Sequence, residues 1–295
     1  MLKKDLIRKI KEEIEKSGFP LELFVIDICS KKNTGRKPNQ RYTYDGKLKE
    51  IDLHAFFEEI KFNSSSNPQH TVSSLIIECK KSKEKPWIFF SSPMFKGSHS
   101  FHFLKYLSTY DDYFLKNKKH KLLGQIWKHI TKNHYLDTKI PKCISYFEAF
   151  KNPNQESRIY DAVQSVLAFM KYNMTNWVSR ERSEYDGFNH FYYPIIVIDG
   201  ALFEANVEDG RTRLIERNHL QIRTLFDGYI YIIDVVKKSY FETLFNIIEM
   251  NHKEIVRAIN KMKIPKELRK GILEKHKKDL HNFRLDFPID YYRSS

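Results

Sequence analysis

The sequence predicts an α/β protein with a mixed β-sheet that helices cover on both faces. Segments with helical periodicity alternate with short apolar segments that have the pattern of β-strands, which is the layout of α/β domains. Residues 75–77 and 195–198 are apolar without interruption. Such runs are typical of strands that are buried on both faces of a sheet. The expected order of elements is helix, helix, hairpin, strands, helix, strands and helices.

Two helices are expected before the first strand. Apolar residues recur every four positions over residues 2–16, which predicts an amphipathic helix. Gly18 can end that helix, and Pro20 suits the first turn of the next one. Residues 20–29 are apolar nearly all round, which predicts a buried helix, and Glu22 lies in its first turn.

A β-hairpin over residues 41–60 should follow, because Asp45 and Gly46 form a strong turn signal between two strand patterns. Polar segments on either side predict loops at residues 33–40 and 63–70. The later elements are predicted as strands at about 72–80, 87–91 and 142–150, a helix at 156–172, two or three strands around an Asp209-Gly210 turn, a strand at 228–236, and helices at about 238–262 and 265–280.

We expect a core over residues 1–236 and a C-terminal helical extension over residues 237–295. A segment at about 94–140 interleaves aromatic residues with lysine and histidine, and it predicts a helical insertion in the core. In the extension, residues 261–280 carry eight lysines or arginines against three acids. Both basic segments are candidate surfaces for nucleic acid or for a protein partner.

The charge of the chain favours a polyanionic partner. Its 295 residues include 51 lysines and arginines against 37 acids, a formal net charge of +14. Nucleic acid is the commonest such partner, although a lysine-rich composition alone also produces a basic protein. Association with a second copy or with a protein partner is left open.

Cysteine and histidine usage argues against two kinds of site. Cys29, Cys79 and Cys143 are far apart and form no C-x-x-C motif, unlike a disulfide framework or a cysteine zinc site. Three histidines in the basic insertion lack ligand spacing and are expected at the surface: His120, His129 and His134. Reduced thiols, no apolar run of about 18 residues and no signal-peptide pattern predict a cytoplasmic protein without a membrane span.

Four charged residues stand out from this background: Glu22 on the buried helix, Asp52, Glu78 and Lys80. Side chains alternate along a strand, so Glu78 and Lys80 should share one face. Asp52 lies between Ile51 and Leu53 on the second arm of the hairpin. Acids in apolar surroundings are expected to gather around a cation, and an oxygen-only ligand set suits Mg²⁺ or Mn²⁺ rather than zinc.

The order of these residues resembles the PD-(D/E)XK nuclease superfamily, which has the restriction-endonuclease-like fold. The match is "EID" followed by "LIIECKKS", an Asp on one strand and Glu-x-Lys on the next. The stretch "SGFPLELFVIDIC" is similar to the first core helix of the branch that includes Mrr-type restriction enzymes and archaeal Holliday-junction resolvases. The resemblance covers about residues 17–92 directly, and the helix at 156–172 more loosely. The chain departs from the pattern at Ile51, where proline is usual, and in the long gap between Asp52 and Glu78.

The resemblance implies metal-dependent hydrolysis of phosphodiester bonds. Asp52 and Glu78 would hold Mg²⁺ or Mn²⁺, with the backbone carbonyl of Cys79 as a further ligand. Lys80 would orient or deprotonate a water and offset negative charge, and Glu22 would complete the site. The favoured function is a DNA endonuclease in a restriction or antiviral defence role.

Several alternatives stay open. The chain could be a structure-specific Holliday-junction-type nuclease, an RNA nuclease, or a non-catalytic nucleic-acid-binding or scaffold protein on the same fold. Glu78 and Lys80 could form only an ion pair at a strand end, and Asp52 could pair with a surface lysine. Glu22 could simply complement the helix dipole, and Gln164 is a weaker candidate for a polar residue facing the site.

Overall fold

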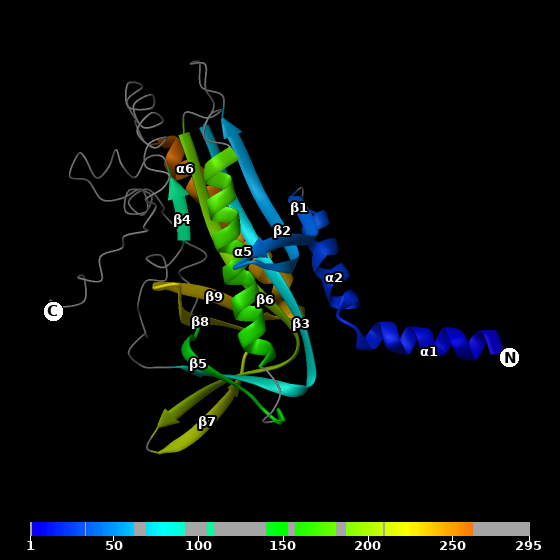
Figure 1. Ribbon diagram of the computed structural model, residues 1–295. Coiled ribbons are helices and arrows are strands. Elements are labelled where there is room, and N and C mark those ends of the chain that lie inside the picture. Colours follow the sequence, from blue (N-terminus) through cyan, green and yellow to red (C-terminus); the bar gives the residue numbers. More distant parts are fainter. Residues whose placement is uncertain are drawn as a thin grey trace.

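The computed structural model describes residues 2–32, 34–61, 69–91, 105–108, 140–152, 157–180, 187–208 and 210–261 (Figure 1). The strands within these residues form one nine-stranded mixed sheet with the path β1-β2-β3-β5-β8-β9-β6-β4, and β7 pairs with β6. The strands are β1 Gly35–Tyr44, β2 Lys47–Lys61, β3 Gln69–Ser91, β4 Lys105–Ser108, β5 Lys142–Glu148, β6 Gly187–Glu208, β7 Arg211–Glu216, β8 His219–Phe226 and β9 Tyr229–Lys237.

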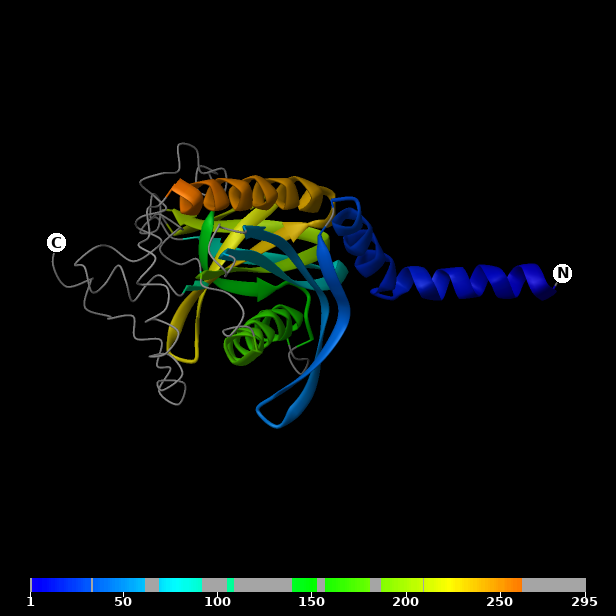
Figure 2. The ribbon, with the colours of Figure 1, turned by 90° about the horizontal axis from the view of Figure 1, so that it is seen from above.

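Helices cover both faces of the sheet, as Figure 2 shows. The described helices are α1 Leu2–Lys16, α2 Phe19–Ser30, α5 Arg158–Arg180 and α6 Phe241–Lys261, the last preceded by a 3₁₀ turn at Lys238–Tyr240. Helices α2, α5 and α6 cover the sheet, whereas α1 extends away from it. Buried residues of α2 and α6 pack with one face of β2, β3 and β6 in a single apolar cluster. Buried residues of α5 pack against the other face in a second cluster. The expected mixed α/β architecture is therefore present.

The long strands β3 and β6 form the centre of the sheet. They run parallel from Gln69 opposite Gly187 to Ser82 opposite Gly200. On its other edge β3 pairs with β2 as far as Ile77, and with β5 from Trp87 onward. Between these two partners, residues 78–82 have β6 on one side and no paired strand on the other among the described residues, and residues 83–86 are not paired with β6 either. We call this segment, residues 78–86, the open segment of β3.

Strand β2 changes face at the residue that precedes its pairing with β3. Ile51 belongs to the apolar cluster under α5, whereas Leu53 belongs to the cluster under α2 and α6. Residues two apart on a regular strand share a face, so the strand is irregular at Asp52. The ladder to β1 is interrupted at the same level, where Asn39 has a left-handed φ of 47°.

Most predicted elements are confirmed. Helices occupy 2–16 and 19–30, and the hairpin turns at Asp45 and Gly46, with φ values of 52° and 71°. Strand 142–148, helix 158–180 and strand 229–237 also lie where they were expected. Gly210, the described residue of the predicted Asp209-Gly210 turn, has a φ of 71° between β6 and β7.

Three predictions of local structure are wrong. Residues 35–40 are not a loop but the start of β1, because backbone pairing with β2 holds a polar, largely exposed segment extended. The strands predicted at 72–80 and 87–91 are one strand, β3. Residues 105–108 are not helical but form β4, which pairs with β6.

Other predictions fall outside the described residues. They include the rest of the insertion up to residue 139, the loop at 63–68, His120, His129 and His134, the helix at 265–280 and the basic residues beyond Lys261. The part of the predicted C-terminal extension that is described, α6, shares its apolar cluster with α2.

Candidate active site

The open segment of β3 carries the predicted Glu-x-Lys motif at its beginning. The backbone N–H of Cys79 donates a hydrogen bond to Asp52 Oδ2 at 2.6 Å. This side chain takes the place of the missing neighbouring strand as a partner for the β3 backbone. The irregularity of β2 at Asp52 therefore brings the Asp52 carboxylate to the backbone of β3, directly beside Glu78.

Glu78 and Lys80 form a close ion pair. Lys80 Nζ lies 2.5 Å from Glu78 Oε1, which fits the expectation that alternate residues of a strand share a face. The Glu78 side chain is 5% exposed, whereas that of Lys80 is 27% exposed. Glu78 Oε2 is buried and has no hydrogen-bond partner among the described residues. One oxygen of this buried carboxylate is thus neutralised and the other is left unpaired.

The surroundings of Glu78 disfavour its charged form. Burial raises the pKa of Glu78 to about 7, and the negative charges of Asp52 and Glu22 act in the same direction. The ammonium of Lys80 lowers the pKa but does not offset burial. A carboxylate with an unpaired oxygen in such a place would be stabilised in its charged form by a further cation.

Glu22 and Asp52 both lie close enough for their charges to act on the Glu78 carboxyl. Burial raises the pKa of each carboxyl. The charge of Asp52 raises the pKa of Glu22 further, and Lys80 lowers the pKa of both. Gly18 gives the Glu22 carboxylate room, because a Cβ at residue 18 would lie 3.1 Å from Glu22 Oε1. The structure therefore brings Glu22, Asp52, Glu78 and Lys80 together from α2, β2 and β3.

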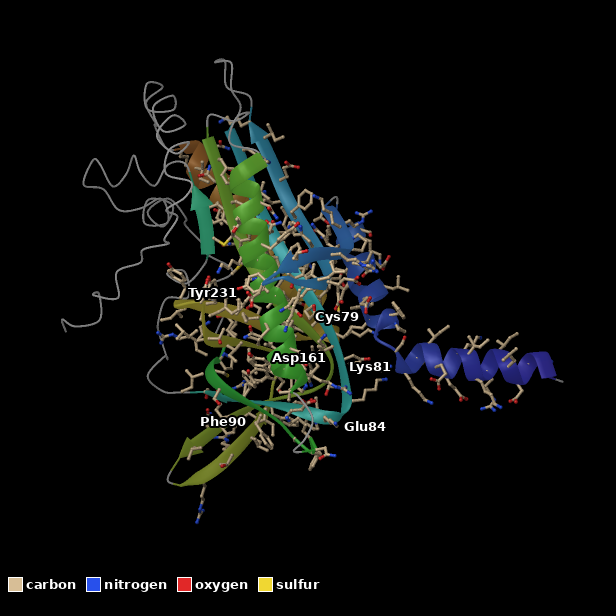
Figure 3. The ribbon with its side chains drawn as sticks, in the orientation of Figure 1. Cys79, Lys81, Glu84, Phe90, Asp161 and Tyr231 are labelled. Atoms are coloured by element: carbon tan, nitrogen blue, oxygen red, sulfur yellow. The ribbon has the colours of Figure 1, made fainter. Side chains whose placement is uncertain are left out.

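Lys80 keeps its proton in this environment. Burial acts to lower its pKa, but the negative charges of Glu78, Asp52 and Asp161 outweigh burial, and the pKa is raised. Asp161 was not among the predicted residues. It is exposed in the first turn of α5, beside the part of β3 that carries Cys79 and Lys81 (Figure 3). The sequence does not single out Asp161, because an acid in the first turn of a helix is expected from the helix dipole alone.

Cys79 contributes its backbone and not its thiol. The side chain is buried in the cluster under α2 and α6, on the face opposite to Glu78 and Lys80. Burial raises the pKa of its thiol well above the ordinary value, so the thiol is a poor ligand and nucleophile. Gln164, the weaker candidate, lies on α5 one turn beyond Asp161 and is half-buried.

The donor set can be tested against the expected metal. Within the described ranges, no group of three or more His, Cys, Asp or Glu residues could hold a metal ion. Asp52 and Glu78 form a smaller set of two carboxylates, and the backbone carbonyl of Cys79 would add a third oxygen. Hard oxygen donors, together with the unpaired buried Glu78 Oε2, fit Mg²⁺ or Mn²⁺ in chemical type.

The rest of the open segment forms a basic rim beside these residues. Ser82 lies opposite Gly200 and Trp87 lies opposite Leu202, so residues 83–86 bulge out against a single residue of β6. A Cβ at Gly200 would lie 2.4 Å from the Ser82 carbonyl oxygen, which shows how closely the strands approach there. The bulge and its flank carry three lysines beside the site: Lys81, Lys83 and Lys85.

Hydrogen bonds fix the two ends of this rim. Arg158 Nη1, at the start of α5, donates to the Lys81 carbonyl at 3.0 Å. Ser82 Oγ donates to the Lys85 carbonyl at 2.7 Å. Lys81 is half-buried and Lys83 is exposed. A lysine run at a strand edge of this kind can be solvated or can contact phosphate.

Comparisons with protein-family models, with curated proteins and with solved structures found no match for this chain. The resemblance to the PD-(D/E)XK superfamily therefore rests on the motif order and stays a prediction. Of the helices that the structure describes, none has the length and apolar character needed to cross a membrane.

Proposed function

We propose that this chain is a metal-dependent nuclease that hydrolyses phosphodiester bonds, with DNA as the favoured substrate. The observation that carries the proposal is the convergence of Asp52, Glu78 and Lys80 at the open segment of β3. Two carboxylates and one protonated lysine meet there, and one buried carboxylate oxygen is unpaired. The proposal includes a restriction-endonuclease-like core built from β1, β2, β3 and β6 with α2 and α5.

Each residue has a role that follows from its surroundings. Asp52 and Glu78 would hold Mg²⁺ or Mn²⁺ together with the Cys79 carbonyl. A cation bound there supplies Lewis acidity, which acidifies water and offsets charge on the phosphate. Glu22, only partly buried, is placed to accept a hydrogen bond from a water at the edge of the site.

For Lys80 we propose one of two possible roles. The sequence leaves open whether it removes a proton from water or offsets negative charge. Its raised pKa keeps it protonated near neutral pH, so we assign it to offset charge on a phosphate oxygen and to orient the water. Its side chain, 27% exposed, can reach a substrate that lies along the rim of β3.

The basic rim supports the choice of a polyanionic substrate. Lys81, Lys83 and Lys85 follow the site along the same strand, and the chain as a whole carries a net charge of +14. Such charge attracts nucleic acid without reading its sequence. A restriction or defence role would suit a nuclease of this kind. The three cysteines are free and buried, which supports the proposed reducing, cytoplasmic location.

The proposal is tested by incubating the purified protein with supercoiled plasmid, linear duplex, branched DNA and RNA. Each substrate is given Mg²⁺, Mn²⁺ or excess EDTA. We expect cleavage of DNA that requires the cation. Preferential cleavage of branched DNA would favour a structure-specific nuclease, and cleavage of RNA alone would move the substrate to RNA. Binding without cleavage under every condition, or full cleavage in EDTA, would contradict the proposed function.

A further inference from the structure

Helix α1 projects away from the rest of the molecule, as Figures 1 and 2 both show. Every side chain from Lys4 to Lys16 is exposed. A 15-residue helix without tertiary packing is only marginally stable in water. The helix therefore lacks, within the described residues, the packing that normally keeps a helix of this length folded.

One face of α1 is apolar and uncovered. Leu6, Ile7, Ile10 and Ile14 lie on one side of the helix at 3.6-residue periodicity, and their exposed fractions are between 46% and 58%. Two residues of the adjoining α2 add to the uncovered apolar area, Phe19 at 63% and Leu23 at 64%. An amphipathic helix of this pattern normally buries its stripe against another element.

The charges that flank the stripe indicate what covers it. Residues 2–9 of α1 carry four basic residues against one acid, whereas residues 10–16 carry three acids against two lysines, Lys11 and Lys16. Among them, Lys4 and Lys9 lie in the first half, and Glu13 and Glu15 lie in the second half. If two copies of α1 run antiparallel and cross at Ile10, the basic half of each helix faces the acidic half of the other. A parallel pair would instead place like charges together.

We propose that α1 pairs with α1 of a second copy of this chain in an antiparallel, two-fold symmetric arrangement. Leu6 of one copy would lie over Ile14 of the other, Lys4 near Glu15, and Lys9 near Glu13. A two-fold interface of this kind is self-complementary, which suits a stripe whose two halves carry opposite charge. The proposal does not rest on the proposed nuclease activity.

A membrane surface is a poorer occupant for the same stripe. Helices that lie in a membrane interface carry a polar face rich in Lys and Arg. The polar face of α1 also carries several acids, among them Glu12 and Glu15, and Arg8 is already paired with Glu12 at 2.7 Å. A polar face of mixed charge is typical of a helix that pairs with another helix.

The test is the mass of the full chain in solution, measured by sedimentation velocity over about 1 to 100 µM, the range of a modest interface. We expect the wild-type mass to rise to twice 35.4 kDa across the series. The double variant Ile7→Gln, Ile10→Gln should weaken association by about a hundredfold or more, because it removes two apolar side chains per copy.

A matched control removes two charges from the opposite face at the same level of the helix. Arg8→Gln with Glu12→Gln breaks only a contact within α1 and should associate like wild type. If circular dichroism shows that the double Ile variant misfolds, Ile10→Gln alone carries the test.

Charge reversal tests the orientation. Glu13→Lys with Glu15→Lys should weaken association by about tenfold at low salt. Adding Lys4→Glu and Lys9→Glu to the same chain should restore it. Glu13→Lys also breaks the Glu13–Lys16 ion pair and Lys9→Glu breaks the Asp5–Lys9 pair, both within α1. Circular dichroism of each variant therefore checks that the helix is retained.

A wild-type chain that stays monomeric throughout the series would overturn the proposal, as would equal association of the wild type and the Ile variants. If monomeric wild type instead binds phosphatidylserine vesicles through the same isoleucines, the stripe faces a membrane. Failure of the rescue by Lys4→Glu and Lys9→Glu would overturn the antiparallel orientation.

Discussion

Two polar clusters are buried on the central strands, and they differ in a way that separates structure from chemistry. The first is the candidate site at Asp52, Glu78 and Lys80. The second, which we call the histidine network, consists of His54, Ser74, His190 and Tyr192. In it, Ser74 Oγ lies 3.0 Å from His54 Nε2 and 2.6 Å from His190 Nε2, and His190 Nδ1 lies 3.0 Å from the Tyr192 hydroxyl.

Burial favours the neutral form of the titratable groups in both clusters, but only the candidate site keeps a charged group. Burial lowers the pKa of His54 to about 3 and that of His190 well below its ordinary value, so both rings stay neutral. Neutral rings and hydroxyls can satisfy each other without a counter-charge. In the candidate site, Lys80 is charged and Glu78 Oε2 is unpaired. His54 Nδ1 is also buried without a hydrogen-bond partner among the described residues, but the histidine network carries no charge. The site instead combines an unpaired carboxylate oxygen with a charged lysine, both of which a ligand could use.

The largest difference should appear when a carboxylate of the site is neutralised. Asp52→Asn should lower the cleavage rate by about a thousandfold or more, because an amide is a far poorer ligand for Mg²⁺ than a carboxylate. The same change should abolish the rise in melting temperature that Mg²⁺ gives to the wild type. Cleavage assays and thermal unfolding with and without Mg²⁺ check both effects. An unchanged response to Mg²⁺ would remove Asp52 from the cation site.

The opposite pattern is expected in the histidine network. Ser74→Ala leaves two buried imidazoles without their shared partner and should destabilise the fold by about 2–4 kcal/mol. Cleavage per folded molecule should stay near the wild-type value. Urea unfolding measures the loss, and Ser17→Ala, which removes an exposed hydroxyl at the end of α1, is the control. A selective loss of cleavage without loss of stability would mean that the network takes part in the chemistry.

Glu78 should make the stability of the fold depend on pH. Its pKa rises from 4.5 to about 7 on folding, so the folded state holds a proton that the unfolded state has lost between these values. The contribution of Glu78 to the free energy of unfolding is fully present below about pH 4.5. It is lost as the pH rises through about 7, and the loss amounts to up to about 3 kcal/mol. The buried histidines His54 and His190 act in the opposite direction, so the contribution of Glu78 is the difference between wild type and Glu78→Gln in urea unfolding with EDTA. From pH 4.5 to 7 the wild type should lose stability relative to Glu78→Gln, and an unchanged or opposite difference would contradict the burial of this carboxyl.

The smallest effect should come from the residue that only supports the charge of Lys80. Asp161 is exposed, so Asp161→Asn should lower the turnover rate by only about threefold to tenfold. Glu84→Gln, which neutralises another exposed acid on the neighbouring bulge, should have less effect. Equal rates for Asp161→Asn and wild type would limit Asp161 to a role at the start of α5.

The sequence pattern predicted much of this arrangement because the relevant signals are local. Alternation along one strand places Glu78 and Lys80 on one face, and the observed ion pair agrees with it. The Asp-Gly turn and the apolar stripes likewise depend on neighbouring residues only. The catalytic and metal-binding roles of these residues stay predictions.

What the sequence did not reveal depends on contacts between distant segments. Strand β8, at residues 219–226, was not foreseen, because its buried His219 and Gln221 hide the apolar alternation; both bond to Asp234 of β9. The face change of β2 at Asp52 arises from packing on both sides of the sheet. Asp161 acts on Lys80 across 81 positions of sequence, and no local pattern indicates that.

The central claim is that Lys80 acts on a substrate and is more than half of an ion pair. The most direct test compares the cleavage rates of Lys80→Ala, Lys81→Ala and Lys83→Ala under identical conditions with Mg²⁺. We predict that Lys80→Ala loses about 10²–10³ or more in rate while folding and DNA binding stay near wild type. The two control variants, which remove the same charge from neighbouring positions, should cleave nearly as fast as wild type. Retained cleavage in Lys80→Ala, or equal losses in all three variants, would contradict the account.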